Sequence, residues 1–519
     1  MKHAAGKVVL LGAGPGDPEL ITARALRRLG ECEVVLYDAL VHPSLLAHAK
    51  PGAVLVSVDV ESSSEPQRAV TERLILEARA GRSVARLVCG DPLLFAQGAQ
   101  QVALLAAAGV AFEIVPGVSA PLAVCAYAGL TLAHRDLSNS VAFFAMADSA
   151  ENDENAHDWE KLATATKTLV LFGSVSSLER TLARLVAHGR SPHEPALTVQ
   201  SASSPQQRTV VGTVGTLASL VHGAQLGAPA LTVVGEVVRL REALRWFDAQ
   251  PLFGKRVLVT RPRGQEAGFA RGLRDAGAEP VLLPTIRLVP PADEDPLARA
   301  AREAARYDAV VFTSANGVTR FFEALRRDGG DARRLGRALV CAIGPATAET
   351  LEGYGVRADI VPTEYRGEAA ADSVLTALGE RVRGARVLLP RAAVAREVLP
   401  ERLVAAGAHV DIVPAYVTVG ASDEDAAAIR AALEARSLDV IALTSSSTAE
   451  QLVALLGADA PRLLLGVTFA SIGPITTATA QKLGLDVAVT ATEYTTPGLL
   501  DALVAHFANL AALTPPSPA

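Results

Sequence analysis

Six hydroxyl and guanidinium side chains in the second half of the chain could together bind a molecule that carries several carboxylates. Each stands where a predicted strand ends and a helix or turn begins: Arg261, Arg391, Ser314, Ser445, Thr347 and Thr476. At that edge of an open α/β sheet, unpaired backbone N–H groups and helix dipoles favour negative charge. The alternative is that the Ser and Thr residues only cap helices, and that the Gly-Pro pairs beside them only form turns.

The first half of the chain begins with a glycine turn that suggests a second kind of site. The apolar run Val8–Leu11 leads into GAGPGD, and Asp38 ends the next apolar run, 24 positions after Gly14. A G-x-G turn followed by an acidic residue at that distance is typical of a dinucleotide site. However, Asp17 occupies the third glycine position, and Pro15 removes a backbone donor that a pyrophosphate would need. A dinucleotide is therefore the weaker interpretation.

Alternating short strands and helices must position these residues. Val/Leu/Ile runs such as Val34–Tyr37 and Leu169–Phe172 alternate with Ala/Arg/Leu-rich stretches of helical spacing, which is typical of α/β units with parallel strands. The polar segment DAQP at 248–251 precedes a new strand, so we divide the chain near residue 250. We predict one domain over 1–248, a second over 254–510, and a disordered, proline-containing tail over 511–519.

Composition limits the class of protein. The 519 residues are 50% hydrophobic and 20% charged, which predicts two to four globular domains and excludes a disordered chain, a collagen-like repeat or a Glu/Lys coiled coil. With a net charge of −6 and no dense Lys/Arg run, no nucleic-acid partner is expected. The four cysteines lie far apart, which argues against a metal site or a disulfide scaffold. No signal peptide and no membrane-spanning stretch are predicted, so the expected location is the cytoplasm.

The second half contains an internal duplication. GKRVLVTR at 254–261 recurs as GARVLLPR at 384–391, DAVVFTS at 308–314 recurs as DVIALTS at 439–445, and IGPAT at 343–347 recurs as IGPIT at 472–476. The triplet TEY at 363–365 recurs at 492–494. Four matches in the same order at nearly constant spacing predict two related α/β halves that face each other across a cleft, and that cleft is the expected site.

The second half contains no nucleophile triad, HExxH or paired-carboxylate motif. The ordered set VLVTRP, DAVVFTSANG, AIGPATA, VLLPR, PAYVT, TSSSTAE and SIGPITTA resembles uroporphyrinogen-III synthase across residues 254–510. The resemblance implies two α/β lobes joined by a hinge, which close hydroxymethylbilane with inversion of the last pyrrole ring and without a cofactor. It also implies that Tyr416 assists departure of the hydroxyl group, while Ser314, Ser445, Thr347 and Thr476 hold acetate and propionate groups. The alternative for Tyr416 is a strand tyrosine that only packs.

The first half carries the motifs GAGPGDPEL, YDALV, CGDPLLF, VPGVSA, YAGLTLAHRD, SPQQRTVVGT and APALTVVGEVV. Over about residues 6–247 this set resembles uroporphyrinogen-III C-methyltransferase and the wider tetrapyrrole methylases. The resemblance implies two α/β subdomains with S-adenosylmethionine bound between them, by Pro15, Cys89, Gly90, Asp91, Leu94, Ser119 and Ala120. Asp38 would be the proton acceptor, and its alternative role is a turn or capping aspartate. A homodimer through this domain is a further expectation.

Several positions depart from the methylase pattern. Val60 and Glu61 replace a lysine and an arginine, Gln97 stands in the altered FGRGGEE segment, and Ala147 stands in the altered TGH segment. These changes remove positive charges that would meet substrate carboxylates. Either Arg86, Arg135 and Arg208 replace them, or the substrate differs, or the domain no longer methylates. In this half of the chain, Arg135 is the residue that we expect to bind the substrate.

Taken together, these observations lead us to expect a bifunctional enzyme with small-molecule tetrapyrrole substrates. The second half would make uroporphyrinogen III, and the first half would methylate it to precorrin-2. Two alternatives stay open at this point. In one, the synthase is fused to a non-catalytic or altered-substrate methylase domain, and in the other the duplicated half is a two-lobed solute-binding module.

Overall fold

A computed structural model describes residues 6–58, 67–96, 98–146 and 157–513. The chain forms two compact units. The N-terminal unit takes in residues up to Lys255, together with 273–279 and the residues from Val504 on, and the C-terminal unit takes in 256–272 and 280–503. Val60, Glu61, Gln97 and Ala147, which depart from the methylase pattern, lie outside the described residues.

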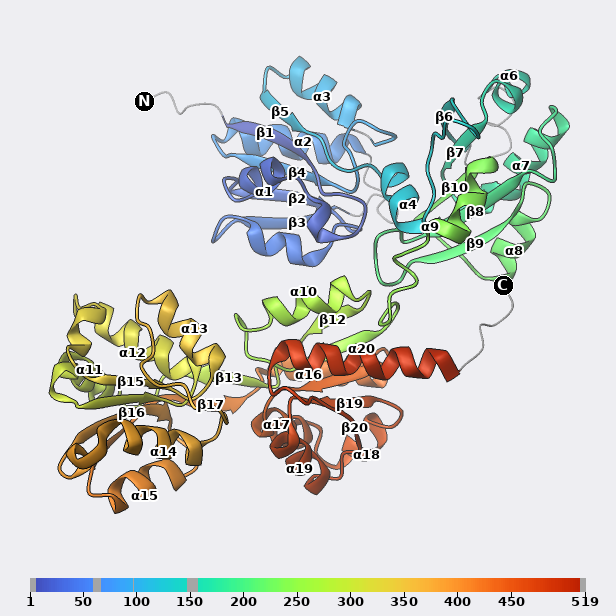
Figure 1. Cartoon of the computed structure of the whole chain (residues 1–519). Coiled ribbons are helices and arrows are strands. Elements are labelled where there is room, and N and C mark those ends of the chain that lie inside the picture. Colours follow the sequence, from blue (N-terminus) through green and yellow to red (C-terminus); the bar gives the residue numbers. More distant parts are fainter. Residues whose placement is uncertain (1–5, 59–66, 97, 147–156, 514–519) are drawn as a thin grey trace. The chain divides into compact units, whose positions relative to one another are not determined.

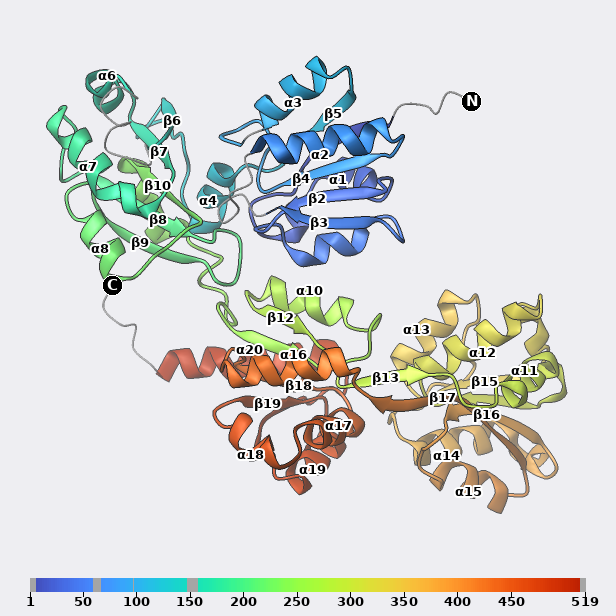
Figure 2. The same cartoon turned by 180° about the vertical axis from the view of Figure 1, so that it is seen from behind.

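The first subdomain of the N-terminal unit is a five-stranded parallel sheet in the order β3-β2-β4-β1-β5. Its strands are β1 (Lys7–Gly12), β2 (Val34–Asp38), β3 (Val54–Val58), β4 (Val84–Val88) and β5 (Ala111–Val115), and its helices are η1 (Pro18–Leu20), α1 (Ala23–Leu29), η2 (Pro43–His48), α2 (Gln67–Arg79) and α3 (Gly98–Ala107). Alternate strand residues face opposite sides, so Leu11 packs with α1 and Leu10 packs with α2 and α3. Figures 1 and 2 show these helices on the two faces.

The second subdomain is a mixed sheet in the order β6-β7-β10-β8-β9. Its strands are β6 (Val141–Ala145), β7 (Thr168–Phe172), β8 (Pro195–Gln200), β9 (Arg208–Thr213) and β10 (Ala230–Val234), and its helices are α4 (Ala120–Ala128), α6 (Trp159–Thr164), η3 (Val175–Ser177), α7 (Leu178–Ala187), α8 (Leu217–Gly223), η4 (Glu236–Leu240) and α9 (Arg241–Leu244). Only β6 and β7 pair in parallel, whereas β10 is antiparallel to β7 and β8, and β8 to β9. The prediction of parallel strands was therefore wrong for this sheet, because the short loop 201–207 turns the chain straight back as a hairpin.

The C-terminal unit contains two lobes. The first lobe has the sheet order β12-β11-β18-β19-β20 and the second has β13-β17-β16-β14-β15. Their strands are β11 (Arg256–Val259), β12 (Glu279–Leu282), β18 (Val440–Leu443), β19 (Thr468–Ser471) and β20 (Val487–Thr490), and β13 (Ile286–Val289), β14 (Ala309–Phe312), β15 (Leu339–Ala342), β16 (Arg386–Ala392) and β17 (His409–Gly420). The chain crosses between the lobes at β13 and β17, which pair antiparallel and join the lobes (Figure 1).

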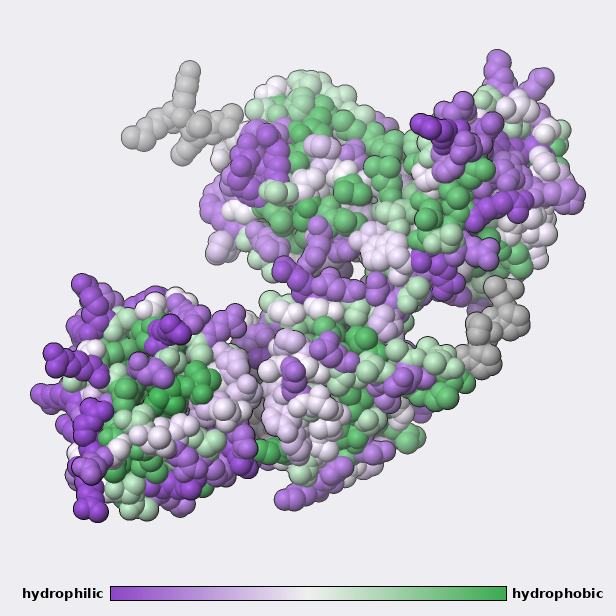
Figure 3. All heavy atoms as spheres, in the orientation of Figure 1, coloured by the Kyte–Doolittle hydropathy of each residue, from purple (hydrophilic) through white to green (hydrophobic). Residues whose placement is uncertain are grey.

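Helices cover both lobe sheets. In the first lobe these are α10 (Ala267–Asp275), α16 (Asp423–Glu434), α17 (Ser446–Leu456), η8 (Gly457–Asp459), α18 (Ala460–Leu463), α19 (Pro474–Lys482) and α20 (Thr496–Leu513). In the second lobe they are α11 (Asp295–Arg302), η5 (Ala304–Arg306), α12 (Ala315–Arg327), η6 (Ala332–Leu335), α13 (Pro345–Gly353), α14 (Gly367–Leu378), η7 (Gly379–Val382) and α15 (Val398–Ala405). In Figure 3, hydrophilic residues cover most of the outer rim of the second lobe.

The two copies of the internal duplication do not correspond to the two lobes. Val257 of β11, in the first copy, pairs with Val440 of β18, in the second copy. In the other lobe Val387 of β16, in the second copy, pairs with Ala309 of β14, in the first. Each lobe therefore combines the opening strands of one copy with the later strands of the other. The equivalent residues still meet in equivalent registers, so both lobes keep the same local geometry.

The C-terminal helix differs from expectation in two respects. It continues to Leu513, so residues 511–513, which we expected in the tail, are helical, because Ala511, Ala512 and Leu513 favour helix and the first proline comes at 515. Residues 514–519 lie outside the described part. With a mean hydropathy of 1.2 over its 18 residues, α20 also meets the length and composition of a membrane span, although no such stretch was predicted. Leu499 and Leu503 of α20 are fully buried, whereas its last residues, 508–513, are exposed.

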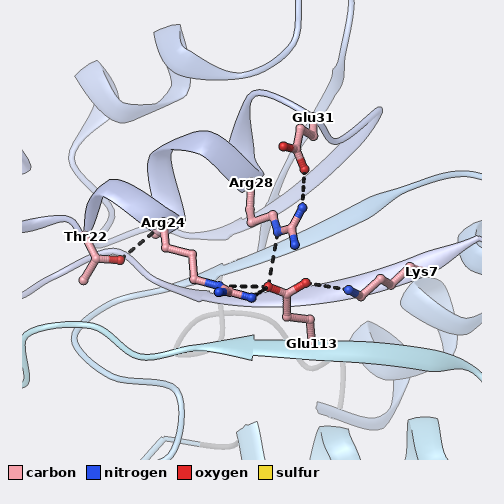
Figure 4. Close-up of polar contacts among 7 residues, drawn as sticks. Lys7, Thr22, Arg24, Arg28, Glu31 and Glu113 are labelled. Atoms are coloured by element: carbon pink, nitrogen blue, oxygen red, sulfur yellow. Dashed lines mark hydrogen bonds and ion pairs between the residues drawn. The ribbon is translucent and has the colours of Figure 1, made fainter.

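An ion cluster ties β1 and α1 to β5. Glu113 accepts hydrogen bonds from Lys7 (Nζ to Oε2, 2.5 Å), Arg24 (Nη2 to Oε1, 2.6 Å) and Arg28 (Nε to Oε1, 3.2 Å), as Figure 4 shows. Hydrogen bonds from Lys7 and Arg24 are the largest influences, and they lower the pKa of Glu113 from 4.5 to about 2. The side chain is only 11% exposed, so the carboxylate depends on these partners.

We expect Glu113→Gln to destabilise the N-terminal unit by about 1–2 kcal/mol at pH 7, a value kept small because Lys7 and Arg24 are partly solvated. Since the folded-state pKa lies below the unfolded one, the stabilisation is complete above about pH 4.5 and disappears as the pH falls toward 2. Denaturant unfolding of the full chain at several pH values should show the two proteins converging in acid. Glu31→Gln, which removes an exposed partner of Arg28, should cost less than 0.5 kcal/mol, and an equal loss in both variants would contradict the assignment.

Candidate functional site

A cavity of about 460 Å³ opens between the two subdomains of the N-terminal unit. Its wall comes from the loops after β1, β2 and β4 and from α4, β7, the β8–β9 loop and the start of β10: Pro15, Gly16, Ala39, Leu40, Val41, His42, Pro43, Cys89, Ala120, Val124, Phe172, Val199, Ser201, Ala202, Ser204, Pro229, Ala230 and Leu231. Three of the residues predicted to bind a cofactor, Pro15, Cys89 and Ala120, are among them. The carboxyl ends of parallel strands thus supply one wall, where ligands of α/β folds commonly bind.

Gly90 and Asp91 do not line this cavity, but they follow the wall residue Cys89 and hold the neighbouring loops together. Gly90 forms a backbone bridge with Gly14, donating to its carbonyl at 2.7 Å. A Cβ on Gly117 would lie 2.2 Å from the carbonyl oxygen of Gly90, so only glycine allows the three loops to meet. The Asp91 carboxylate accepts the backbone N–H groups of Leu93 (2.8 Å) and Gly117 (3.0 Å). Asp91 therefore fixes two loops, and the geometry favours this role over direct contact with a ligand.

Leu94 and Ser119 also lie outside the wall. Leu94 is half-buried, and its N–H points to the Asp91 carbonyl at 3.4 Å. Ser119 is the residue before α4, and its side chain makes no capping hydrogen bond. It directly precedes Ala120, which does line the cavity.

Asp38 is held on both carboxylate oxygens at the end of β2. Arg86 donates from Nη2 to Oδ1, and the backbone N–H of Cys89 donates to Oδ2 at 3.0 Å. Arg86 is almost completely buried on the neighbouring strand β4, and its Nη1 is bound to the Leu87 carbonyl at 3.0 Å. The carboxylate is thus paired with Arg86, oriented and 18% exposed, directly before the segment 39–43 of the cavity wall. Such a group can accept a proton from a bound ligand.

None of the three arginines offered as one possible replacement for the missing cations lines this cavity. Arg86 is occupied by Asp38. Arg135 lies exposed in the turn after α4 and is outside the cavity wall. Arg208, at the start of β9, is exposed and donates to the Ala224 carbonyl at 2.6 Å. Contact of Arg135 with the substrate stays a prediction.

The motif analysis missed most of the far wall of the cavity. Phe172, Ser201, Ser204 and Leu231 come from the second subdomain, and their approach depends on how the two sheets pack. The segment 39–43 could have been predicted from the sequence, because it overlaps and continues the motif YDALV. Cys89 adds a neutral group to the wall, since burial, reinforced by Asp38, raises the pKa of its thiol to about 11.

The predicted residues of the C-terminal unit follow the carboxyl ends of parallel strands in both lobes. Gln265, after β11 in the first lobe, hydrogen-bonds to Asn316 at the start of α12 in the second lobe. This bond joins the two carboxyl edges directly. The cleft between the lobes stays a prediction, and because each lobe combines strands of both copies, the duplicated halves themselves do not form its two walls.

Tyr416 and Ser314 form one polar pair on the second lobe. Their hydroxyl oxygens are 3.1 Å apart, and Ser314 also accepts the N–H of Gly317 as the cap of α12. Tyr416 is 8% exposed at the end of β17, beside Ala392 of β16. The equivalent position of the other copy, 130 residues earlier, holds Ile286. The tyrosine hydroxyl thus occurs in one copy and not in the other, so the two copies differ at this position.

Arg261 and Arg391 are equivalent in sequence and differ in their contacts, although the Nε atom of each is buried without a hydrogen-bond partner among the described residues. Arg391 is buried and donates to the Arg396 carbonyl (2.8 Å) and to the Glu397 carboxylate (2.6 Å), which favours a structural role over the predicted substrate contact. Burial lowers the pKa of Arg261, opposed by Glu266. Its Nε and one oxygen of Glu266 are buried without a hydrogen-bond partner among the described residues. An anionic ligand at this edge would satisfy Arg261.

The remaining predicted hydroxyl residues lie at the N-terminal ends of helices. Ser445 caps α17 in a reciprocal box with Thr448 and contacts the Ser447 hydroxyl at 2.9 Å. Thr347 and Thr476 are buried in the first turns of α13 and α19, 4% and 5% exposed. Ser445 therefore fits the capping alternative, and Ser314 combines a cap with the contact to Tyr416. Gly344 and Gly473 are the N-cap residues of α13 and α19, so Thr347 and Thr476 do not cap these helices.

Comparison with known proteins identifies both units. Residues 7–218 match the family of Tetrapyrrole (Corrin/Porphyrin) Methylases, and residues 267–501 match the family of Uroporphyrinogen-III synthase HemD. A siroheme synthase of Acinetobacter baylyi is 41% identical over 244 residues, which is 47% of this chain and 53% of that protein. The chain thus spans about half the length of that relative. A uroporphyrin-III C-methyltransferase structure from Thermus thermophilus is 39% identical, covering 45% of this chain and 100% of that one with a TM-score of 0.39.

One relative spans both units. The porphyrin biosynthesis protein HemD of Ruminiclostridium josui is 32% identical over 506 residues, 97% of this chain and 98% of that protein. The order of the two family matches agrees with the order of the two units. The chain therefore belongs to the family of fused tetrapyrrole methylase and uroporphyrinogen-III synthase proteins, and it is a bifunctional enzyme of tetrapyrrole biosynthesis.

Proposed function

We propose that the C-terminal unit closes hydroxymethylbilane to uroporphyrinogen III, and that the N-terminal unit methylates this product to precorrin-2 with S-adenosylmethionine. The observation that carries the proposal is the end-to-end similarity to a porphyrin biosynthesis protein, with both family matches in one chain. Consecutive steps in one chain keep the product of the first at high local concentration beside the second. The proposed domain limits are 1–248 and 254–510.

In the ring closure, Tyr416 would donate a hydrogen bond or proton to the departing hydroxyl group of the substrate, which leaves as water. The resulting azafulvene cation is attacked by the substituted carbon of the terminal ring, and the spiro intermediate fragments and recloses with loss of a proton. Ser314, 3.1 Å from Tyr416, keeps the phenol oriented. Arg261, whose Nε is buried and unpartnered among the described residues, would bind a carboxylate of the substrate. Positioning supplies most of the rate because the substrate is already reactive.

The cavity of the N-terminal unit fits S-adenosylmethionine in size and chemistry. Its volume of about 460 Å³ lies in the range of small-molecule sites, and its wall is apolar apart from backbone groups, Ser201, Ser204, His42 and the neutral Cys89 thiol. Pro15, Cys89 and Ala120 would contact the bound cofactor, which supplies an activated methyl group. Asp38, fixed by Arg86, would accept the proton that the pyrrole carbon of the substrate releases.

A second candidate concerns the substrate of the N-terminal unit alone. Arg86, Arg135 and Arg208 are all turned to other partners or to solvent, which favours methyl transfer to a tetrapyrrole with fewer ionised carboxylates. Under this candidate uroporphyrinogen III is a poor acceptor, while the cavity still binds the cofactor.

Two assays on the full chain test the proposal. Hydroxymethylbilane alone should yield uroporphyrinogen III, identified by its isomer after oxidation. Uroporphyrinogen III with S-adenosylmethionine should yield a product heavier by two methyl groups. Failure of the first assay removes the synthase half of the proposal. Success in the first with an unmethylated product in the second would favour the alternative substrate or a non-catalytic methylase domain.

A further inference from the structure

The repeated triplet TEY places one tyrosine in an equivalent position on each lobe. Tyr365 lies in the loop before α14, and Tyr494 lies in the loop before α20. Tyr365 is 45% exposed and Tyr494 is 54% exposed. No hydrogen bond of either hydroxyl group to another described residue is found. Each copy of the duplication thus carries one half-exposed aromatic ring at the same position.

Each ring packs on the glycine of an IGP motif. A Cβ on Gly344 would come within 3.2 Å of Cδ1 of Tyr365, and a Cβ on Gly473 would come within 2.8 Å of Cδ1 of Tyr494. The φ angles of the two glycines, −170° and 168°, describe extended backbone that any residue adopts. Glycine is therefore needed at these positions for the ring that covers it, and the same arrangement is kept in both lobes.

Both rings lie at the carboxyl edges of the two lobe sheets. Gly344 follows β15 and Gly473 follows β19, so each ring lies at the carboxyl edge of its parallel sheet. The hydrogen bond from Gln265 to Asn316 joins these two edges. One face of each ring is covered by backbone, and the other part is open to solvent, as a stacking surface requires.

We propose that Tyr365 and Tyr494 are a matched pair of stacking surfaces that position pyrrole rings of the linear tetrapyrrole, one on each lobe. The inference rests on the proposed synthase function and names the residues that hold the rings rather than the carboxylates. Aromatic contact suits this task because every pyrrole presents a flat aromatic ring whatever its side chains carry, and such rings pair favourably in offset or edge-to-face arrangements. Two stacking points on separate lobes would hold the flexible chain bent toward closure.

Alanine and phenylalanine variants of the full chain test the pair. Tyr365→Ala and Tyr494→Ala should each raise the KM for hydroxymethylbilane about five- to tenfold, with kcat changed less than about threefold. Tyr365→Phe and Tyr494→Phe keep the ring and should stay within about twofold of the parent. Gly473→Ala keeps the ring and forces it to move, so it should raise KM as Tyr494→Ala does. Leu465→Ala, at an exposed apolar residue of the first lobe, is the matched control and should leave KM unchanged.

The outcomes separate this inference from the proposed function. If the parent protein does not close hydroxymethylbilane, the proposed function fails and the pair fails with it. If the parent closes it and the alanine variants keep their KM within about twofold, or the phenylalanine variants lose as much as the alanine variants, the inference alone is overturned. Thermal unfolding of each variant identifies any change that comes from misfolding.

Discussion

Asp38→Asn should lower kcat for methyl transfer at least about 100-fold, because the amide can accept the hydrogen bond from Cys89 but cannot take a proton from the substrate. S-adenosylhomocysteine should still bind, since Asp38 is not part of the cavity wall. Transfer of labelled methyl groups to the tetrapyrrole measures the first effect, and calorimetry with S-adenosylhomocysteine measures the second. Ring closure by the same preparation should be unaffected.

The variant also leaves Arg86 buried without its anionic partner, and breaking a buried pair commonly costs about 3–5 kcal/mol. The assay must therefore run where calorimetry shows that the cofactor site is intact. Glu179→Gln removes an exposed carboxylate from α7 of the same unit and should retain full activity. If Asp38→Asn binds S-adenosylhomocysteine and still transfers methyl groups at the parent rate, Asp38 is a structural residue.

Tyr416→Phe should lower kcat for ring closure about 100-fold while KM changes little, because only the proton-donating hydroxyl group is lost. The packing of the ring remains, because Tyr416 is only 8% exposed in the second lobe and phenylalanine keeps the same ring. Steady-state kinetics with hydroxymethylbilane give both parameters. The expected split between kcat and KM distinguishes Tyr416 from the stacking tyrosines, for which KM should change.

Tyr354→Phe is the matched control for this prediction. Tyr354 belongs to the same lobe and stacks on Phe322 with ring centroids 4.6 Å apart, so its hydroxyl can be removed without disturbing the Tyr416 pair. We expect parent-like kinetics. Ser314→Ala should give an intermediate loss, because it removes both the partner of Tyr416 and the cap of α12. A fully active Tyr416→Phe enzyme would exclude Tyr416 as the acid.

Much of the fold followed from local pattern. The apolar runs at 8–11, 34–37 and 169–172 form β1, β2 and β7 as predicted, because buried parallel strands leave a continuous apolar signature. The mixed strand directions of the second sheet could not be predicted, because the apolar pattern of a strand does not show whether it pairs parallel or antiparallel. The exchange of strands between the lobes was equally hidden, because similarity between two copies does not say which copy supplies each neighbour in a sheet.

The sites were predictable only where one motif supplies the residue. Pro15, Cys89 and Ala120 line the cavity, and each belongs to a recognisable loop. The contact between Ser314 and Tyr416 spans 102 positions and depends on a register shift between β16 and β17 at Arg391/Ala392, which no local pattern reveals. The contacts of Arg391 could not be predicted either, because its ion pair with Glu397 forms only in the folded structure.

The most direct test of the fused-enzyme account supplies hydroxymethylbilane and S-adenosylmethionine labelled in its methyl group to the full chain in one reaction. The account predicts a closed macrocycle that carries two labelled methyl groups. It also predicts that Asp38→Asn stops the reaction at unlabelled uroporphyrinogen III, and that Tyr416→Phe slows appearance of any macrocycle. A macrocycle formed at full rate without label from the parent protein would contradict the account.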